Sequence, residues 1–161
     1  MSQVEIASAR PGEVDAVVAL LGLAGLPQDG VRQLVPTLLV ARAGGGLVGS
    51  AAIEPYGHEA LLRSVAVAPA LRGGGLGRRL AEAAVALAGR LGVERLYLLT
   101  ETAAPFFARL GFRPVSRADV PASVQASPEF AFLCPASAQA MVRDLGAVPA
   151  ARGIFSPAPS V

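Results

Sequence analysis

The glycine-rich segment at residues 72–78 has the residue types needed to bind an anion. Gly73, Gly75 and Gly77 follow an apolar run and precede a stretch with apolar residues at helical spacing. Glycine adopts positive φ and has no Cβ, so successive backbone N–H groups can converge on a phosphate where a helix begins. Arg72 and Arg78 add positive charge beside the turn. The sequence therefore predicts a phosphate-binding turn between a buried strand and a helix.

Two other glycine-rich phosphate motifs are excluded. A P-loop ends in Gly-Lys-Ser/Thr, and a dinucleotide fold needs G-x-G-x-x-G followed by an acidic residue that binds ribose. The chain contains no lysine, and Arg78 and Arg79 follow Gly77. The turn therefore serves a different phosphate ligand.

Composition points to one cytoplasmic domain that binds neither nucleic acid nor membrane. The chain has 161 residues, a net charge of +2, no Trp and two Tyr, so it lacks a basic surface with stacking aromatics. The first residues do not resemble a signal peptide, and no apolar stretch is long enough to span a bilayer. Cys134 is the single cysteine and His58 the single histidine, which argues against a disulfide framework and a metal site.

The hydrophobic periodicity predicts an α/β domain over residues 1–145. A strand, the glycine turn, a helix and a second strand should form a right-handed crossover that places 61–68 and 95–100 in parallel. Residues 146–161 contain several prolines and are predicted to be a flexible tail. The predicted strands are 4–6, 37–43, 47–53, 61–68, 95–100, 112–115 and 138–145, and the predicted helices are 15–23, 29–34, 76–91 and 104–110.

The pattern Arg72-x-x-Gly75-x-Gly77 resembles the pyrophosphate signature of the GCN5-related N-acetyltransferases (GNAT), which move acetyl from acetyl-CoA to an amine. The resemblance implies the GNAT fold, a mixed central β-sheet with splayed parallel strands flanked by helices on both faces. It also implies acetyl-CoA as cosubstrate, with its pantetheine arm between the splayed strands and its pyrophosphate on the glycine turn. The residues that it assigns to the coenzyme are Val65, Val67, Arg72, Gly73, Gly75, Gly77 and Arg78.

The second half resembles a narrower group. The runs Leu98-Leu99-Thr100-x-Thr102, Phe106-Phe107-x-x-Leu110-Gly111-Phe112 and Cys134-Pro135-Ala136-Ser137-Ala138 are similar to the acetyltransferase domain of N-acetylglutamate synthases. They are more similar still to small arsenic-resistance-associated N-acetyltransferases. This resemblance implies a glutamate-like acceptor of the arsinothricin or phosphinothricin type, and a homodimer. Two alternatives stay open: acetylation of a peptide or protein N-terminus, and a non-catalytic CoA-binding sensor.

Arg63 is the residue singled out for substrate binding. A guanidinium in a buried strand needs an anionic partner, which would be either a carboxylate or arsinate of the substrate or an internal Glu or Asp. Simple alternation places Arg63 on one face with Leu61, Val65 and Val67. Ser64 then lies on the opposite face unless a bulge, common in this strand of the family, turns it toward the cleft.

The groups that would move protons are harder to assign. Many superfamily members carry at the position of Phe107 a Tyr that protonates the leaving thiolate. Glu101, just past the second parallel strand, is a candidate base. Ser64 is a second catalytic candidate, because a bulge that turned it toward the cleft would let it bond the amine or the thiol. Glu54 is interpreted as the solvated end of a hairpin, opposite Glu59, and His58 as a surface turn residue. The lone thiol of Cys134 is assigned to an apolar core or loop.

Overall fold

The computed structural model describes residues 3–146, which fold around a mixed sheet of seven strands in the order β1-β2-β3-β4-β5-β7-β6. The strands are β1 (Glu5–Ser8), β2 (Leu38–Ala43), β3 (Gly46–Tyr56), β4 (Glu59–Val67), β5 (Arg95–Thr100), β6 (Arg113–Val115) and β7 (Gln139–Asp144). The helices are α1 (Val14–Leu23), α2 (Leu76–Arg90), α3 (Ala104–Ala108) and α4 (Ala122–Gln125). Short 3-10 segments lie at Pro11–Glu13, Val31–Thr37, Pro69–Leu71 and Arg117–Asp119, and a π-helical turn at Glu129–Leu133.

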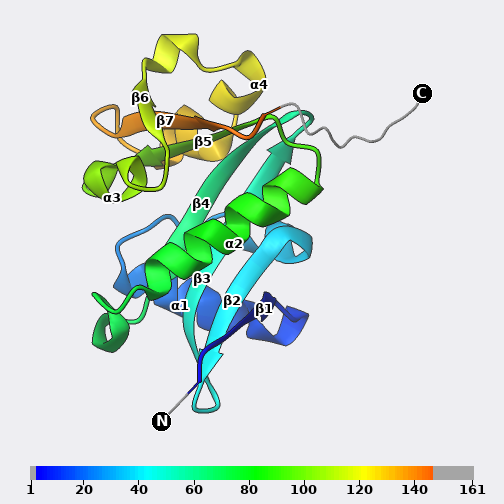
Figure 1. Cartoon of the computed structure of the whole chain (residues 1–161), viewed down its shortest axis with the longest axis vertical. Coiled ribbons are helices and arrows are strands. Elements are labelled where there is room, and N and C mark those ends of the chain that lie inside the picture. Colours follow the sequence, from blue (N-terminus) through cyan, green and yellow to red (C-terminus); the bar gives the residue numbers. More distant parts are fainter. Residues whose placement is uncertain (1–2, 147–161) are drawn as a thin grey trace, which may run out of the picture.

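The predicted fold class is confirmed, because helices pack on both faces of this sheet (Figure 1). The sequence-based boundaries of β5 match the structure. Those of α1, α2 and β2 differ by one residue at one end, and those of β7 by one residue at each end. The predicted helix at 29–34 is instead a 3-10 segment, Val31–Thr37, that contains Pro36. The predicted tail, 146–161, lies outside the described residues except for Gly146, and the division at residue 145 stays a prediction.

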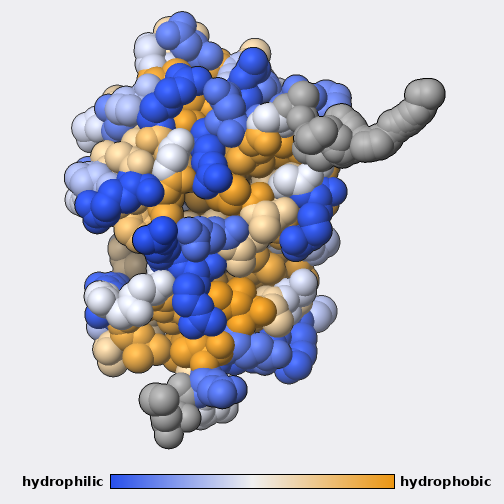
Figure 2. Space-filling model, viewed as in Figure 1, coloured by the Kyte–Doolittle hydropathy of each residue, from blue (hydrophilic) through white to orange (hydrophobic). Residues whose placement is uncertain are grey.

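The two faces of the sheet have separate apolar cores. Leu80 and Ala84 of α2 pack with Ile53 of β3 and Leu62 of β4 on one face. The other face is covered by α1, and a third cluster joins Leu61 to Val124 of α4. The outward side of α2 bears hydrophilic side chains, which face the viewer in Figure 2. In the described part of the chain, no helix has the length and hydropathy required to cross a membrane.

The parallel strands β4 and β5 separate soon after they meet, as the resemblance to the GNAT fold implied. Their register covers only Glu59↔Arg95 to Leu61↔Tyr97, while β5 pairs with β7 along its whole length. The carboxyl ends of β4 and β5 therefore diverge (Figure 1). Backbone groups of β4 beyond Leu61 that face β5 have no strand partner there.

A β-bulge in β4 changes the direction of its side chains. Ser50 pairs with Ala66 and Ala52 with Arg63, so β4 carries one residue more than β3 across this step. Ser64 takes a positive φ of 61°, which is uncommon for a residue other than glycine. The expectation that Arg63 shares a face with Val65 and Val67 is therefore wrong. Arg63 keeps the face of Leu61, whereas the two valines pack on the core beneath α2.

Candidate functional site

A cavity of about 500 Å³ opens where β4 and β5 diverge. Its wall is built from the bulged half of β4, the end of β5, α3, the first turn of α2 and the π-helical turn. The loop at residues 24–27, after α1, closes another side and was not expected from the sequence. This volume lies in the range of pockets that hold small molecules and cofactors.

One end of the cavity is the glycine turn. Gly73 and Gly75 have φ of 87° and 88°, and α2 starts directly after them, so its first N–H groups are free to face an anion. Arg72 lines the cavity, and its Nε donates a hydrogen bond to the Val67 carbonyl oxygen at 3.1 Å. A Cβ at Gly77 would stand 3.6 Å from both Val67 and Phe106. Glycine at 77 therefore keeps the passage between strand and helix wide.

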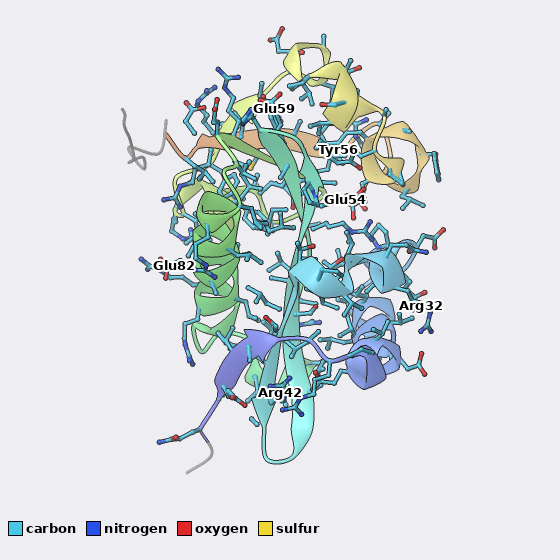
Figure 3. The ribbon with its side chains drawn as sticks, turned by 90° about the vertical axis from the view of Figure 1, so that its right-hand side faces the viewer. Arg32, Arg42, Glu54, Tyr56, Glu59 and Glu82 are labelled. Atoms are coloured by element: carbon cyan, nitrogen blue, oxygen red, sulfur yellow. The ribbon has the colours of Figure 1, made fainter. Side chains whose placement is uncertain are left out.

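The predicted coenzyme residues divide into three groups. Val65, Val67, Arg72 and Gly77 line the cavity. Gly73 and Gly75 shape the turn beside it. Arg78 instead forms an ion pair with Glu82 at 3.2 Å on the outer side of α2, where Figure 3 labels Glu82.

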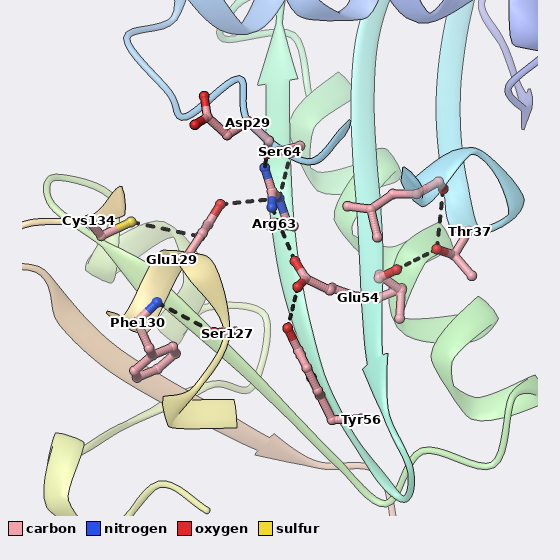
Figure 4. Close-up of polar contacts among 12 residues, drawn as sticks. Asp29, Thr37, Glu54, Tyr56, Arg63, Ser64, Ser127, Glu129, Phe130 and Cys134 are labelled. Carbon is pink, nitrogen blue, oxygen red and sulfur yellow. Dashed lines mark hydrogen bonds and ion pairs between the residues drawn. The ribbon is translucent and has the colours of Figure 1, made fainter. Parts of the chain in front are cut away.

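The other end of the cavity contains a buried charged cluster around Arg63, shown in Figure 4. The Arg63 side chain is 1% exposed. Its Nη1 donates to Glu54 Oε1 at 3.1 Å and its Nη2 to the Asp29 carbonyl oxygen at 2.6 Å. Its Nε donates to Ser64 Oγ and forms an ion pair with Glu129 Oε2, both at 3.2 Å. The internal partners that the sequence left open are therefore Glu54 and Glu129.

The interpretation of Glu54 as a solvated hairpin end is wrong. β3 continues through Pro55 to Tyr56, and the chain turns at Gly57 with φ 70°. Glu54 consequently pairs in register with Leu61 rather than Glu59, and the Tyr56 hydroxyl donates to its carboxylate. Proline and tyrosine before glycine resembled a longer turn, because proline favours turns. His58 does lie in the turn, exposed, 3.6 Å from the Glu94 carboxylate.

Sequence reasoning missed Glu129. It belongs to the π-helical turn of the segment between β6 and β7, and it lines the cavity. Its side chain is 6% exposed. The available signal was a carboxylate inside the apolar run Glu-Phe-Ala-Phe-Leu, at 129–133, because a buried carboxylate needs a partner. Single-turn π segments inside helical regions also occur frequently at functional sites.

The other candidates occupy different parts of the same cavity. Ser64 is turned to the cavity wall by the bulge. Glu101 lines the wall but is exposed, and it lies just beyond β5 as expected. Phe106 and Phe107 of α3 supply an apolar wall. At position 107, where many superfamily members carry a tyrosine hydroxyl, this wall has only the phenylalanine ring.

Cys134 lies on the cavity wall, with Sγ 3.8 Å from Glu129 Oε1. Burial, followed by the nearby charge of Glu129, raises the pKa of this thiol to about 12. The thiol is therefore protonated at neutral pH and is a poor nucleophile. Within residues 3–146, no three His, Cys, Asp or Glu side chains are grouped as metal ligands.

The comparisons with known proteins agree with this geometry. Residues 36–114, from the start of β2 to β6, match the sequence model of the acetyltransferase (GNAT) domain. Over these residues the chain is similar to the GNAT acetyltransferase domain. The matched segment contains both strands that border the cavity, the glycine turn and α3. The enzyme class predicted from the sequence, an N-acetyltransferase, is the class of this domain.

Solved structures share the whole fold. N-acetylglutamate synthase from Neisseria gonorrhoeae, complexed with coenzyme A and N-acetyl-glutamate, is 23% identical with a TM-score of 0.76, and the match covers 89% of this chain and 35% of that one. Rv2747 from Mycobacterium tuberculosis, in complex with CoA, is 24% identical with a TM-score of 0.76 over 88% of this chain and 99% of that one. A GNAT-family acetyltransferase from Staphylococcus aureus is 14% identical with a TM-score of 0.71, over 89% and 99%.

The chain spans about a third of the length of the N. gonorrhoeae synthase. A search of the curated proteins finds no match to its sequence. The shared fold therefore fixes the architecture, and the substrate has to be argued from the cavity.

Proposed function

We propose that this protein transfers acetyl from acetyl-CoA to the α-amine of a small, glutamate-like amino acid. One observation carries the proposal: a single cavity joins the glycine turn at Arg72 and Gly77 to the buried charged cluster at Arg63 and Glu129. A pyrophosphate-bearing ligand at the first end would direct its thioester along β4 toward the second end. The cavity volume lies in the range of pockets that hold small molecules and cofactors.

The chain provides suitable contacts for the coenzyme. Backbone groups of β4 near Val65 and Val67 lack a β5 partner, so they can hydrogen-bond an amide-containing arm. The N-terminus of α2 and the Arg72 guanidinium suit a pyrophosphate, as two structurally similar proteins are complexes with CoA. When bound, acetyl-CoA would supply the electrophilic carbonyl carbon. The residues of the cavity then orient the acceptor and exclude water.

The free donors of Arg63 favour an acceptor that carries an anionic group. A guanidinium has five N–H donors, and three of them are used by Ser64, Glu54 and Asp29. The remaining two N–H groups can bind a carboxylate, arsinate or phosphinate oxygen. The N. gonorrhoeae synthase, complexed with N-acetyl-glutamate, is a structural neighbour, which makes glutamate-like acceptors the first to test.

The decisive experiment is incubation of the protein with acetyl-CoA and single acceptors, with CoA thiol release and product mass as readouts. The acceptors are arsinothricin, phosphinothricin, glutamate, glutamine, other amino acids and short peptides. Release with a glutamate-like amine supports the proposal. Acetylation of peptides alone favours the peptide alternative, and CoA binding without turnover favours a sensor.

Arg63→Lys tests the acceptor site itself. Lysine keeps the charge but loses the planar fork that binds an oxyanion through two N–H groups. The KM for an acidic acceptor should rise at least tenfold, while the KM for acetyl-CoA stays within twofold. An unchanged acceptor KM would mean that Arg63 only holds Glu54 and Glu129 together.

Three finer expectations stay predictions from the sequence. They are a role in arsenic resistance, a cytoplasmic location and a homodimer. Activity on arsinothricin above that on glutamate would support the first.

A further inference from the structure

Arg63 pairs with two carboxylates that have different access to the cavity. Glu54 approaches from β3 and accepts hydrogen bonds from Arg63 and Tyr56. Glu129 approaches from the π-helical turn on the opposite side, and it lines the cavity while Glu54 does not. Figure 4 shows the guanidinium between them. Arg63 therefore pairs with one carboxylate on the cavity wall, Glu129, and with one behind that wall, Glu54.

We infer that Glu129 is the base that removes a proton from the ammonium group of the acceptor. This inference rests on the proposed function, because it needs an amine that arrives protonated. The α-amine of a free amino acid is protonated at neutral pH, so its nitrogen has no lone pair for attack until a proton leaves. A carboxylate on the cavity wall is the group that the acceptor nitrogen would meet.

The two carboxylate oxygens of Glu129 have different neighbours. Oε2 lies 3.2 Å from Arg63 Nε, which fixes the position of the side chain. Oε1 lies 3.8 Å from Cys134 Sγ, a weak donor at a long distance. A carboxylate has about four lone-pair sites, so Oε1 keeps capacity to accept a proton. Glu129 is thus held by one oxygen and open at the other.

The surroundings also make Glu129 a stronger base than an exposed glutamate. Burial is the largest influence on its pKa and raises it, Arg63 lowers it, and the charge of Glu54 raises it again; the net direction is upward. The charged and titratable groups around it are Arg63, Glu54 with its partner Tyr56, and Cys134, with Glu101 at the cavity mouth. A raised pKa brings a general base closer to the pH at which it works.

The other cavity groups fit this task less well. Cys134 holds its proton at neutral pH. Ser64 Oγ already accepts from Arg63. Glu101 is exposed, so water competes for its oxygens.

The reaction then balances as follows. Glu129 takes one proton from the ammonium, and the freed nitrogen lone pair forms the C–N bond to the acetyl carbon. The C–S bond breaks with its electron pair on sulfur, and the second proton lost by nitrogen neutralises that thiolate. Glu129 afterwards releases its proton to water. The products are the N-acetyl amine, CoA thiol and one proton.

Glu129→Gln and Glu54→Gln form a matched pair of variants, because each removes one carboxylate from the same guanidinium. With the best acceptor of the panel, Glu129→Gln should lower kcat at least about 100-fold. In wild type, kcat/KM should fall at low pH as Glu129 is protonated; this acidic limb of the pH profile should be absent in Glu129→Gln and present in Glu54→Gln. If Glu129→Gln retains both the limb and kcat within tenfold, the inference is wrong even though the enzyme turns over.

A second readout needs no turnover. Carboxyl ¹³C resonances of glutamate-labelled protein are followed against pH, and the one missing in Glu129→Gln is that of Glu129. It should titrate above the ordinary glutamate value of 4.5. Titration at or below that value overturns the inference. If Glu129→Gln fails to fold, Glu129→Asp replaces it, with a kcat loss and a retained acidic limb expected. A kcat within twofold of wild type for that variant would contradict a positioned base.

Discussion

The two ends of the cavity are built in different ways. The coenzyme end comes from one continuous segment, in which glycines with positive φ lead into α2. The acceptor end is assembled from β3, β4 and the turn before β7, which are distant in sequence. At the coenzyme end, backbone N–H groups and local conformation form the binding site. At the acceptor end, desolvated side-chain charges form it.

This difference has a physical consequence for tolerance to change. The glycine turn binds through backbone groups, so it loses only one contact when one side chain is removed. In a buried charge cluster, removing one ion leaves each remaining ion without the partner that offset its desolvation. Substitutions at the acceptor end should therefore reduce stability and activity together, and those at the coenzyme end should reduce affinity with little effect on stability.

Arg63→Ala should have the largest effect. It leaves Glu54 and Glu129 buried without the cation that lies between them, and breaking such a cluster costs about 3 kcal/mol of the free energy of unfolding. Urea denaturation of wild type and variant measures this. Adding Glu54→Gln and Glu129→Gln to Arg63→Ala should recover part of the loss, since no charge is then left unpaired. No recovery would mean that packing of the arginine side chain, rather than charge, dominates.

Arg72→Ala should come next, with an effect on binding. Loss of a charged hydrogen bond costs about 1.5–3 kcal/mol, which corresponds to an increase in Kd for CoA of about tenfold to a hundredfold. Arg78→Ala is the matched control, because Arg78 pairs with Glu82 outside the cavity. Calorimetric titration with CoA measures both. Equal losses for the two variants would show that long-range charge, and not the cavity contact of Arg72, binds the pyrophosphate.

An ion pair far from the cavity gives the smallest effect and a reference for pH dependence. Glu13 accepts from Arg42 at 2.6 Å, and Figure 3 shows Arg42 at the other end of the sheet from Glu54. The Arg42 hydrogen bond, and then the Arg10 backbone N–H, lower the pKa of Glu13 from 4.5 to about 2. The folded-state pKa is depressed, so this stabilisation is present above pH 4.5 and is lost as pH falls toward 2.

Glu13→Gln should therefore lower Tm slightly at neutral pH and flatten the decline of Tm between about pH 4.5 and 2. Thermal denaturation across this pH range, followed by circular dichroism, checks the prediction. A parallel decline in both proteins would assign the acid sensitivity to other carboxylates. Activity at neutral pH should be unchanged, because this pair lies outside the cavity.

Much of the coenzyme end could be predicted because its information is local. Glycine spacing, the apolar strand before it and the amphipathic helix after it define the turn within a short window. Arg78 shows the limit of that reasoning, since the motif identifies the residue but α2 directs its side chain toward Glu82.

The acceptor end could be predicted only in part. Arg63 was recognisable because a guanidinium in an apolar strand needs a partner. Glu54 was misplaced by an error of turn length, and Glu129 was not found, because pairing between distant segments leaves no local pattern.

By itself, then, the sequence determined the order of strands and helices, the parallel crossover and the glycine turn, because periodicity and backbone preferences act between near neighbours. Only the tertiary structure decided which carboxylates meet Arg63, and on which face. The β4 bulge at Ser64 reverses the alternation of side chains, and burial of the cluster depends on a turn that arrives from the far end of the chain. Charge burial is a property of the folded assembly, since it requires all partners to leave water together.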